Sequence, residues 1–588
     1  MAKPSNITNR LYFGDNLEWL SKMDSGIVDL VYLDPPFNSQ ATYNLLYKSP
    51  DGQAAQAQYQ AFVDSWRWDY PADVALARIL SSGSPAAEII SALHNYMNKS
   101  DMMAYLVMMT ARLIELQRIL KPSGSLYLHC DTSASHYLKI ILDSVFGPRS
   151  FQNEIIWKRT SAHNDARNRY GDVTDTLLLY ARGGETTFNR QYRSYSPEYI
   201  ESNFRFKDDD GRYYSSENLR SPNPRPNLTY DYKGYKPHAN GWTVSREKME
   251  QLDKEGRLIF PASKEGRIRV KKYLDEMPGL PIANLWDDIG PISSQDAERV
   301  GYQTQKPLAL LKRIIEASSN EGDLILDPFC GCGTAIEAAA LLGRRWIGID
   351  ITPLAIDVVE RRLSRKGLRR NVDYIVEGVP LDMDGAQKLF DSDPLHLQFE
   401  LWALTLVDGQ PRDGGKAGAD KGIDGLIFFQ DDTKNIGKAV VSVKGGKNAQ
   451  AQHVRDLLGA MTTQRAKMGV FVTMYKTSAM ESAAREAGSV EAGGKLRRAI
   501  QIMTIEELLS GKKPDLPPVH DILSAASAAR KSKSRTVEPT PEEMLRSPQF
   551  KYPISGGKKK PVQESLPMDE PLLVQPQPSK GRGRKKSA

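Results

Sequence analysis

Residues 324–334 read Leu-Ile-Leu-Asp-Pro-Phe-Cys-Gly-Cys-Gly-Thr, an apolar strand that runs into a glycine-containing loop. A helix pattern follows, and then a second strand, Arg344-Arg-Trp-Ile-Gly-Ile-Asp350, which ends in an acid. Strand, glycine turn, helix, strand and acid are typical of a nucleoside-binding βαβ unit. Gly331 and Gly333 let the backbone approach a ligand closely, and Asp350 stands where a carboxylate binds ribose hydroxyls. The alternative is an α/β crossover of the same pattern without a ligand.

A second apolar run, Val28-Asp-Leu-Val-Tyr-Leu33, ends in Asp34-Pro-Pro-Phe37. This pattern predicts a buried strand followed by a rigid turn, at the edge where open α/β sheets bind their ligands. The Asp34 carboxylate and the Pro35 carbonyl can each accept one hydrogen of an exocyclic amine on a flipped-out base, and Phe37 can stack on its ring. Because Asp-Pro-Pro also occurs in ordinary turns, a purely structural turn is the alternative.

Three further segments occur in a consistent order with these two. Residues 304–307 read Thr-Gln-Lys-Pro and precede a helix pattern at 308–317, residues 116–131 predict a loop and a strand, and residues 153–158 predict another strand. Together the segments resemble the DNA amino-methyltransferases that use S-adenosylmethionine, in the permuted beta arrangement in which the catalytic tetrapeptide precedes the cofactor loop. The resemblance covers about residues 10–365 and implies a Rossmann-like α/β fold.

The resemblance also implies a reaction and its residues. The catalytic residues would be Asp34, Pro35, Pro36 and Phe37. The cofactor would be bound by Lys306, Pro307, Asp327, Phe329, Cys330, Gly331, Gly333, Thr334 and Asp350. In this family an aspartate in first place of the tetrapeptide is commoner for the 6-amino group of adenine, and a serine for the 4-amino group of cytosine. Both amines present two hydrogens to the same acceptors, so we expect adenine on that association and keep cytosine as the alternative.

Composition and charge agree with a multidomain protein that acts on DNA. The chain has 588 residues, of which 40% are hydrophobic and 26% charged, so we expect two domains and tails. Three cysteines provide no disulfide framework, and the apolar core of a signal peptide is missing from the first residues, which predicts a reducing, cytoplasmic location near the nucleoid of a bacterial or phage-type host and no membrane partner. From residue 511 onward, 16 basic and 8 acidic residues occur in a Pro-, Ser- and Lys-rich tail. We expect this tail to be disordered, either as a solvated extension or as a phosphate-binding segment.

A polar interval, residues 159–300, separates the two halves of the resemblance. In the permuted family this interval is the target-recognition region, and its aromatics alternate with cations that suit base stacking and phosphate contact. The alternative, which we expect for about half of these rings, is a small core. The aromatics are Tyr192, Tyr195, Tyr199, Tyr213, Tyr214, Tyr230, Tyr232, Tyr235 and Trp242. Residues 50–100 exceed a minimal fold and predict a helical cover near the catalytic strand.

The remaining folded segment, about residues 395–509, begins with a helix pattern at 397–404, followed by Gly418-Ala-Asp-Lys-Gly-Ile-Asp-Gly425 and strands at 426–429 and 439–444. A helix at 454–461, a strand at 469–473 and a final segment at 500–508 complete it. This order resembles the Mrr-like branch of the restriction-endonuclease fold. The resemblance implies Asp424 as the metal ligand, Lys444 as the catalytic lysine and Glu400 as a supporting acid. Ser442 stands where an acid or amide ligand is expected, and a hydroxyl is a weak ligand for a hard cation such as magnesium. Asp420 is a substitute ligand at most. Asp424 is therefore expected to hold magnesium only if the nuclease is active, and an inactive domain that binds DNA is the other reading.

These predictions divide the chain into five parts. They are a catalytic half at 10–158, a target-recognition region at 159–300, a cofactor-binding half at 301–380, a restriction-endonuclease-like α/β domain at 394–510 and the basic tail at 511–588. The leading hypothesis is an adenine-specific DNA methyltransferase with an accessory nuclease-like domain, acting on double-stranded DNA. A fused restriction-modification enzyme is the second hypothesis, and a methyltransferase of RNA or an orphan regulator is the third. The sequence leaves open whether the chain forms a homodimer.

Overall fold

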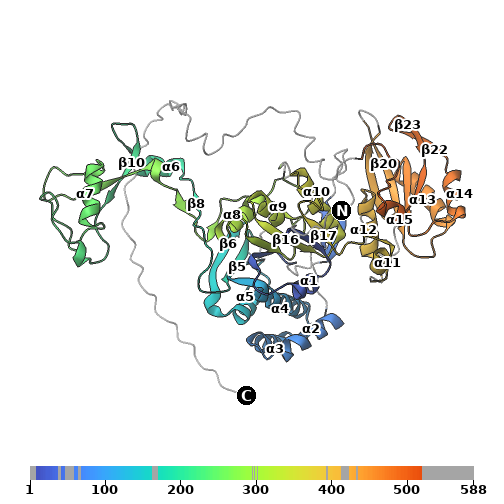
Figure 1. Cartoon of the computed structure of the whole chain (residues 1–588), viewed down its shortest axis with the longest axis horizontal. Coiled ribbons are helices and arrows are strands. Elements are labelled where there is room, and N and C mark those ends of the chain that lie inside the picture. Colours follow the sequence, from blue (N-terminus) through green and yellow to red (C-terminus); the bar gives the residue numbers. More distant parts are fainter. Residues whose placement is uncertain are drawn as a thin grey trace, which may run out of the picture. The chain divides into compact units, whose positions relative to one another are not determined.

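The computed structural model of the chain is drawn in Figure 1. It describes residues 8–36, 42–46 and 58–63 (backbone only), 68–161, 170–293, 296, 298–300, 302, 304–392, 395–411, 423–431 and 435–519. Phe37, Asp420 and the predicted tail beyond Val519 lie outside these residues. Within the described residues, no helix is both long and apolar enough to cross a membrane.

The first domain is built on a nine-stranded sheet in the order β14-β6-β7-β5-β2-β15-β16-β1-β17. Neighbouring strands are parallel except β7, which runs antiparallel to β5 and β6. The bounds are β1 Arg10–Phe13, β2 Val28–Leu33, β5 Leu120–Cys130, β6 Phe151–Lys158, β7 Thr174–Ala181, β14 Leu285–Trp286, β15 Leu324–Asp327, β16 Arg345–Asp350 and β17 Ile375–Glu377. The predicted Rossmann-like α/β fold is confirmed.

The pairing of β2 with β15 places the two most informative sequence segments side by side. Leu30 pairs with Ile325 and Val31 with Leu326. Because the two strands are parallel, their carboxyl ends lie at the same edge of the sheet, where open α/β sheets bind ligands. Asp34 and Asp327 are therefore neighbours in space although almost 300 residues separate them in the chain.

Helices cover both faces of this sheet, and each face has its own apolar core. One face is covered by α1 Asn16–Lys22, α2 Tyr70–Ser81, α3 Pro85–Met97, α4 Asp101–Ile119 and α5 Ser135–Phe146, and the other by α8 Leu308–Ser318, α9 Thr334–Leu341 and α10 Pro353–Arg365. Twelve of the 19 residues of α4 are buried, so this helix is the centre of the first core rather than an amphipathic surface helix. The predicted helical cover corresponds to α2 and α3. A short hairpin, β3 Thr42–Leu46 and β4 Gln58–Val63, precedes them.

The interval between β7 and β14 contains an antiparallel sheet in the order β11-β12-β10-β9, which we call the insert together with the rest of residues 192–281. Its elements are β8 Tyr192–Arg193, α6 Pro197–Asn203, β9 Phe206–Lys207, β10 Tyr213–Asn218, α7 Arg246–Lys254, β11 Leu258–Ile259, β12 Arg269–Tyr273 and β13 Leu280–Pro281. Tyr232, Tyr235 and Trp242 are buried in its small core, and Tyr230 packs against them. The core alternative therefore holds for these four rings.

The last described domain has a five-stranded sheet in the order β18-β19-β20-β21-β24. Its elements are α11 Met383–Ser392, α12 Leu397–Leu406, β18 Gln410–Pro411, β19 Gly425–Gln430, β20 Ile436–Lys444, α13 Ala451–Gln464, β21 Met468–Thr473, α14 Ser478–Glu486, β22 Ser489–Ala492, β23 Lys495–Arg498, β24 Ile500–Thr504 and α15 Ile505–Leu509. The chain stays in contact with this sheet past residue 511, where the tail is expected to begin. The Gln430 amide donates to the Pro518 carbonyl (2.9 Å), and Arg497 pairs with Asp515 (3.0 Å).

Candidate active site

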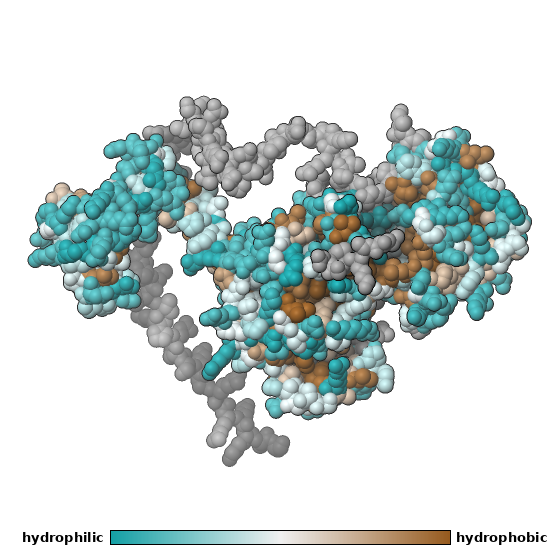
Figure 2. Space-filling view, viewed as in Figure 1, coloured by the Kyte–Doolittle hydropathy of each residue, from teal (hydrophilic) through white to brown (hydrophobic). Residues whose placement is uncertain are grey.

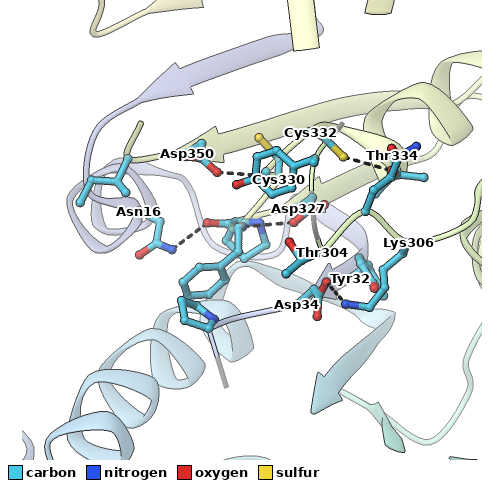
Figure 3. Close-up of a pocket in the computed structure, with 18 of the residues that line it drawn as sticks. Asn16, Tyr32, Asp34, Thr304, Lys306, Asp327, Cys330, Cys332, Thr334 and Asp350 are labelled. Carbon is cyan, nitrogen blue, oxygen red and sulfur yellow. Dashed lines mark hydrogen bonds and ion pairs between the residues drawn. The ribbon is translucent and has the colours of Figure 1, made fainter. Parts of the chain in front are cut away.

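A cavity of about 260 Å³ opens at the carboxyl edge of the large sheet (Figure 3). Its walls come from the ends of β1, β2, β15 and β16, from the loop before α8 and from the start of α9. Of the residues predicted from sequence, those that line it are Asp34, Pro36, Lys306, Asp327, Phe329, Cys330, Gly331, Thr334 and Asp350. Pro35, Pro307 and Gly333 do not line it: Pro35 is buried, Pro307 is the N-cap residue of α8, and Gly333 is the N-cap residue of α9.

Asp34 directly follows β2, and its two carboxylate oxygens have different surroundings. Its Oδ2 accepts a hydrogen bond from the Lys306 ammonium at 2.5 Å. Its Oδ1 is buried, and no donor among the described residues reaches it. A buried acceptor without a donor is costly unless a ligand supplies one. Lys306, which we expected to touch the cofactor, is thus placed to hold the Asp34 carboxylate in one orientation (Figure 3).

The glycine loop between β15 and α9 is held in shape by Asp350. Gly331 and Gly333 have φ of +48° and +74°, a region that glycine adopts without a steric penalty. The Gly331 amide donates to Asp350 Oδ2 at 2.9 Å. Asp350 Oδ1 accepts from both the amide and the hydroxyl of Thr352, each at 2.9 Å. Burial raises the pKa of Asp350, and these three donors offset part of that cost because they stabilise the carboxylate.

Gly333 is further constrained by the helix that packs behind the loop. A Cβ at this position would lie 2.7 Å from Val359 Cγ2. On the same side, the Arg362 guanidinium donates to the Cys332 carbonyl at 2.9 Å and to Thr334 Oγ1 at 3.1 Å. The loop is therefore fixed both by the acid at the end of β16 and by an arginine of α10.

Asp327 ends β15 and is buried at the floor of the cavity. Its Oδ1 accepts from the Phe329 amide at 3.1 Å. Burial, with a smaller contribution from the neighbouring carboxylates Asp34 and Asp350, raises its pKa well above the ordinary value. Desolvation dominates because the buried carboxylate has lost its water and has gained one amide donor.

This raised pKa predicts how stability depends on pH. The folded state keeps the Asp327 proton at pH values where the unfolded chain, with a pKa of about 3.9, has released it. The contribution of Asp327 to the free energy of unfolding therefore grows as the pH falls through the raised folded-state pKa toward the unfolded-state pKa. Asp327→Asn keeps the acceptor for Phe329 and removes the titration. We expect urea unfolding to give the variant a higher free energy of unfolding, relative to the parent protein, at pH 8 than at pH 5. A difference that is equal at both pH values would contradict this assignment.

Asp15, Asn16 and Arg112 are among the residues of this site that were missed from the sequence. Asn16 donates to the Pro328 carbonyl at 2.7 Å, and Arg112 of α4 donates to Asn16 and to Asp15 at 2.8 Å. All three line the cavity. Gly14-Asp-Asn16 follows a short strand at the same sheet edge, which is the signal that could have identified them; Arg112 lies in the middle of a helix and gave no such signal.

A buried polar chain lies behind Asp34. Tyr32, which lines the cavity, has its hydroxyl 3.1 Å from His129 Nδ1. His129 Nε2 is 3.1 Å from Asp175 Oδ2, and Arg159 is 3.0 Å from the other oxygen of Asp175. This chain joins β2, β5, β7 and the residue after β6, and it fixes the ring of Tyr32.

The nuclease-like residues converge only in part. Asp424 Oδ2 accepts from the Val443 amide at 2.6 Å and lies 3.4 Å from Ser442 Oγ and 3.5 Å from Lys444 Nζ. Glu400 lies with Lys444 in the wall of another cavity, of about 230 Å³, between α12 and β20. In the described part of the chain, no group of three or more His, Cys, Asp or Glu side chains is arranged to hold a metal ion.

Two family profiles match this sequence. A DNA methylase profile matches residues 28–361, which include the tetrapeptide, the insert and the glycine loop. A profile described as NACHT-associated inactive Restriction Endonuclease 1 matches residues 397–510.

Individual relatives agree with the first profile. Type II methyltransferase M.EcaI of Enterobacter cloacae is 33% identical over 44% of this chain and 58% of its own length. The Mod subunit of the type III restriction-modification enzyme StyLTI of Salmonella typhimurium is 24% identical over 64% of this chain and 56% of its own length. DNA adenine methyltransferase YhdJ of Escherichia coli is 25% identical over 61% of this chain and 84% of its own length. The chain thus spans somewhat more than half the length of the first two relatives.

Proposed function

This chain belongs to the DNA methylase family, and from that premise we propose that it transfers a methyl group from S-adenosylmethionine to an exocyclic amine in double-stranded DNA. One observation carries the proposal: the half-buried Asp34 carboxylate and the glycine loop held by Asp350 face the same cavity. An acceptor for an amine and a cradle for a nucleoside are what the reaction needs to have side by side.

The residues present fit the cofactor. Gly331, at positive φ, lines the cavity without a Cβ atom, and the end of β16 supplies a half-buried carboxylate. We propose that Asp350, Gly331, Thr334 and the floor residue Asp327 hold the nucleoside and methionine parts. When bound, S-adenosylmethionine supplies a methyl group on a sulfonium, which is already an activated leaving group.

The amine is oriented by the segment after β2. Asp34 Oδ1 has no donor among the residues described, so an amino hydrogen of a flipped-out base can satisfy it. The Pro35 carbonyl would accept the second hydrogen and Phe37 would stack on the ring. Two acceptors draw the nitrogen toward tetrahedral geometry and so release its lone pair from the ring. Lys306 holds the carboxylate in place by its ion pair, and the reaction needs no metal ion or covalent intermediate.

We propose adenine as the base, with the 4-amino group of cytosine as the alternative. Aspartate in first place of the tetrapeptide supports adenine, as does the similarity to a relative named as an adenine methyltransferase. The proposed assignment to the permuted beta class is supported by chain order, because the tetrapeptide at 34–37 precedes the glycine loop at 328–333.

The test incubates the purified full chain with unmethylated plasmid and radiolabelled S-adenosylmethionine, and then digests the DNA to nucleosides. Label in 6-methyladenine is the expected result, and label in 4-methylcytosine would move the assignment to the alternative base. Label in RNA alone, in a parallel reaction with transcripts, would overturn DNA as the substrate.

For the last domain we propose an accessory role without cleavage. Ser442 stands beside Asp424 where a second acid or amide ligand is expected, and no group of three or more His, Cys, Asp or Glu side chains among the described residues is arranged around it to hold a metal ion. The Asp424 oxygen nearest the lysine already accepts from the Val443 amide. A single carboxylate with a hydroxyl is a poor site for magnesium. The Mrr-like fold remains a proposal, supported by the mixed sheet and by Lys444 at the end of β20.

We therefore expect no nicking of unmethylated supercoiled plasmid when magnesium is added to the full chain. The measurement is the fraction of open-circular DNA on a gel, with Asp424→Ala as the matched background. Equal, background-level nicking in both proteins supports the accessory role. Magnesium-dependent nicking that Asp424→Ala abolishes would instead support the fused restriction-modification enzyme.

A further inference from the structure

The insert carries a cationic cavity that is separate from the methylation cavity. It has a volume of about 520 Å³ and is formed by the end of β10 and by the loops around residues 234–242 and 264–267. Arg220, Lys236, Lys264 and Arg267 line it, and Glu265 is the one carboxylate among the lining residues. The face of the insert that is seen at the left of Figure 2 is mostly hydrophilic.

The charges of these four cations are not compensated within the described residues. Other cations of the insert are paired: Arg212 with Asp275, Lys271 with Asp208 and Lys272 with Glu217. By contrast, none of the four lining cations forms an ion pair with a carboxylate in the part of the chain that is described. Uncompensated cations that converge on one cavity repel one another, so an anionic ligand stabilises the arrangement.

Two of the lining groups are held in position by neutral partners. Lys264 Nζ donates to the Lys233 carbonyl at 2.9 Å and lies 4.0 Å from the centre of the Tyr235 ring. His238 also lines the cavity, and its Nδ1 accepts from the Asn240 amide at 3.3 Å, which leaves Nε2 to carry the proton. Burial and the charges of Arg220 and Arg267 lower the pKa of His238, in agreement with both guanidinium groups lying close to it.

The aromatic rings around the cavity are not available for base stacking. Trp242 is buried, and its Nε1 donates to the Tyr230 carbonyl at 2.8 Å. Tyr232 donates to Asp253 and Tyr235 to the Pro261 carbonyl, both at 2.7 Å. With the rings committed to the core of the insert, the cavity offers cations and an N–H donor but no stacking platform. That chemistry matches phosphate oxygens and not base faces.

We propose that this cavity binds the phosphate backbone of the duplex next to the target site and so sets the position of the insert on DNA without reading sequence. The proposal rests on the proposed function, which supplies duplex DNA as the substrate. It assigns backbone contact to residues 218–242 and 264–267 and leaves base reading to other parts of the chain.

The test compares two double variants of the full chain. Lys236→Gln/Arg267→Gln removes two lining cations. Arg205→Gln/Lys254→Gln removes two exposed cations of the insert that do not line the cavity. Both lose the same formal charge, and thermal melting checks that both fold. Binding to a fluorescent duplex is measured by anisotropy over a range of salt concentrations without cofactor.

The cavity variant is expected to bind about tenfold more weakly near 0.1 M salt, and the slope of log Kd against log salt is expected to become shallower by about 1.8, because each lost phosphate contact contributes about 0.9. The control should keep the parental slope to within a few tenths of a unit. Equal slopes in both variants and the parent, or equal losses in both variants, would overturn the proposal. So would a loss seen only with duplex RNA, or only with one DNA sequence.

Because binding is measured without methylation, the two proposals fail separately. If the parent chain does not methylate DNA but the cavity variant shows the shallower slope, the phosphate site is supported and the proposed function is contradicted. If the parent chain methylates DNA and the cavity variant keeps the parental slope, only the phosphate-site proposal is contradicted.

Discussion

Asp34→Ala is expected to lower methylation turnover by about 10²–10³-fold or more while the affinity for S-adenosylmethionine stays within about twofold. The reason is the position of the carboxylate. Asp34 lies at the end of β2, faces the cavity and keeps one buried oxygen without a donor in the described structure, whereas the glycine loop is held by Asp350. Removing a preorganised polar group from a reacting centre costs about 10²–10³-fold in rate. The measurements are single-turnover methylation and calorimetric titration of the cofactor.

Asp29→Ala is the matched control, because it removes an ion-paired carboxylate from the other end of the same strand. Asp29 pairs with Lys121 at 2.8 Å and accepts from the Leu324 amide at 2.9 Å, away from the cavity. We expect this variant to lose stability and to keep turnover at a temperature where it is folded. Appreciable turnover in Asp34→Ala, or an equal loss in Asp29→Ala, would show that the catalytic position is assigned wrongly.

Asp350→Ala is expected to give the opposite phenotype, with cofactor affinity reduced at least about 100-fold. The change removes the acceptor for the Gly331 amide and for two donors of Thr352, and hydrogen bonds to a charged group contribute about 1.5–3 kcal/mol each. Without them the loop, with Gly331 at φ +48°, keeps only the Arg362 contacts on the side of α10. Calorimetric titration of S-adenosylmethionine against the variant measures the effect, and saturating cofactor should restore part of the turnover.

Thr352→Val distinguishes loss of the carboxylate from loss of its orientation. This variant keeps Asp350 and its bond to Gly331 but removes the hydroxyl, which donates to Oδ1 and also accepts from the Ala355 amide as the N-cap of α10. An intermediate loss of affinity, about tenfold, is expected from the missing hydrogen bond to Oδ1, and thermal melting measures the cost of the lost cap separately. If Asp350→Ala binds the cofactor as tightly as the parent chain, the nucleoside cradle has been assigned to the wrong loop.

Much of this architecture could be predicted because it depends on local patterns. The strand–loop–helix–strand order of residues 324–350 appears as β15, α9 and β16, since apolar runs, glycines and a terminal acid define that unit in sequence. In the last domain the segments predicted at 397–404, 426–429, 439–444, 454–461 and 469–473 appear in the same way as α12, β19, β20, α13 and β21, whereas α14, β22 and β23 were not predicted. The sequence could not show which aromatic rings of the insert are buried and which are exposed, because an aromatic residue next to cations has the same local pattern in both cases. Only packing separates Trp242, which is buried, from Tyr213, which is 51% exposed.

The sequence by itself determined the chemistry that is available: an acid and two prolines after one strand, a glycine loop after another, and a serine in place of a nuclease ligand. The tertiary structure decided which groups meet. It paired β2 with β15, so that Asp34 and Asp327 line the same cavity, and it brought Lys306 into an ion pair with Asp34. It also brought Arg112 from the middle of α4 to Asp15 and Asn16, and gathered in the insert four cations that form no ion pair with a carboxylate of the described residues. The physical reason is that strand order and side-chain partners depend on contacts between residues far apart in the chain, and one sequence read along its length carries no direct record of those contacts.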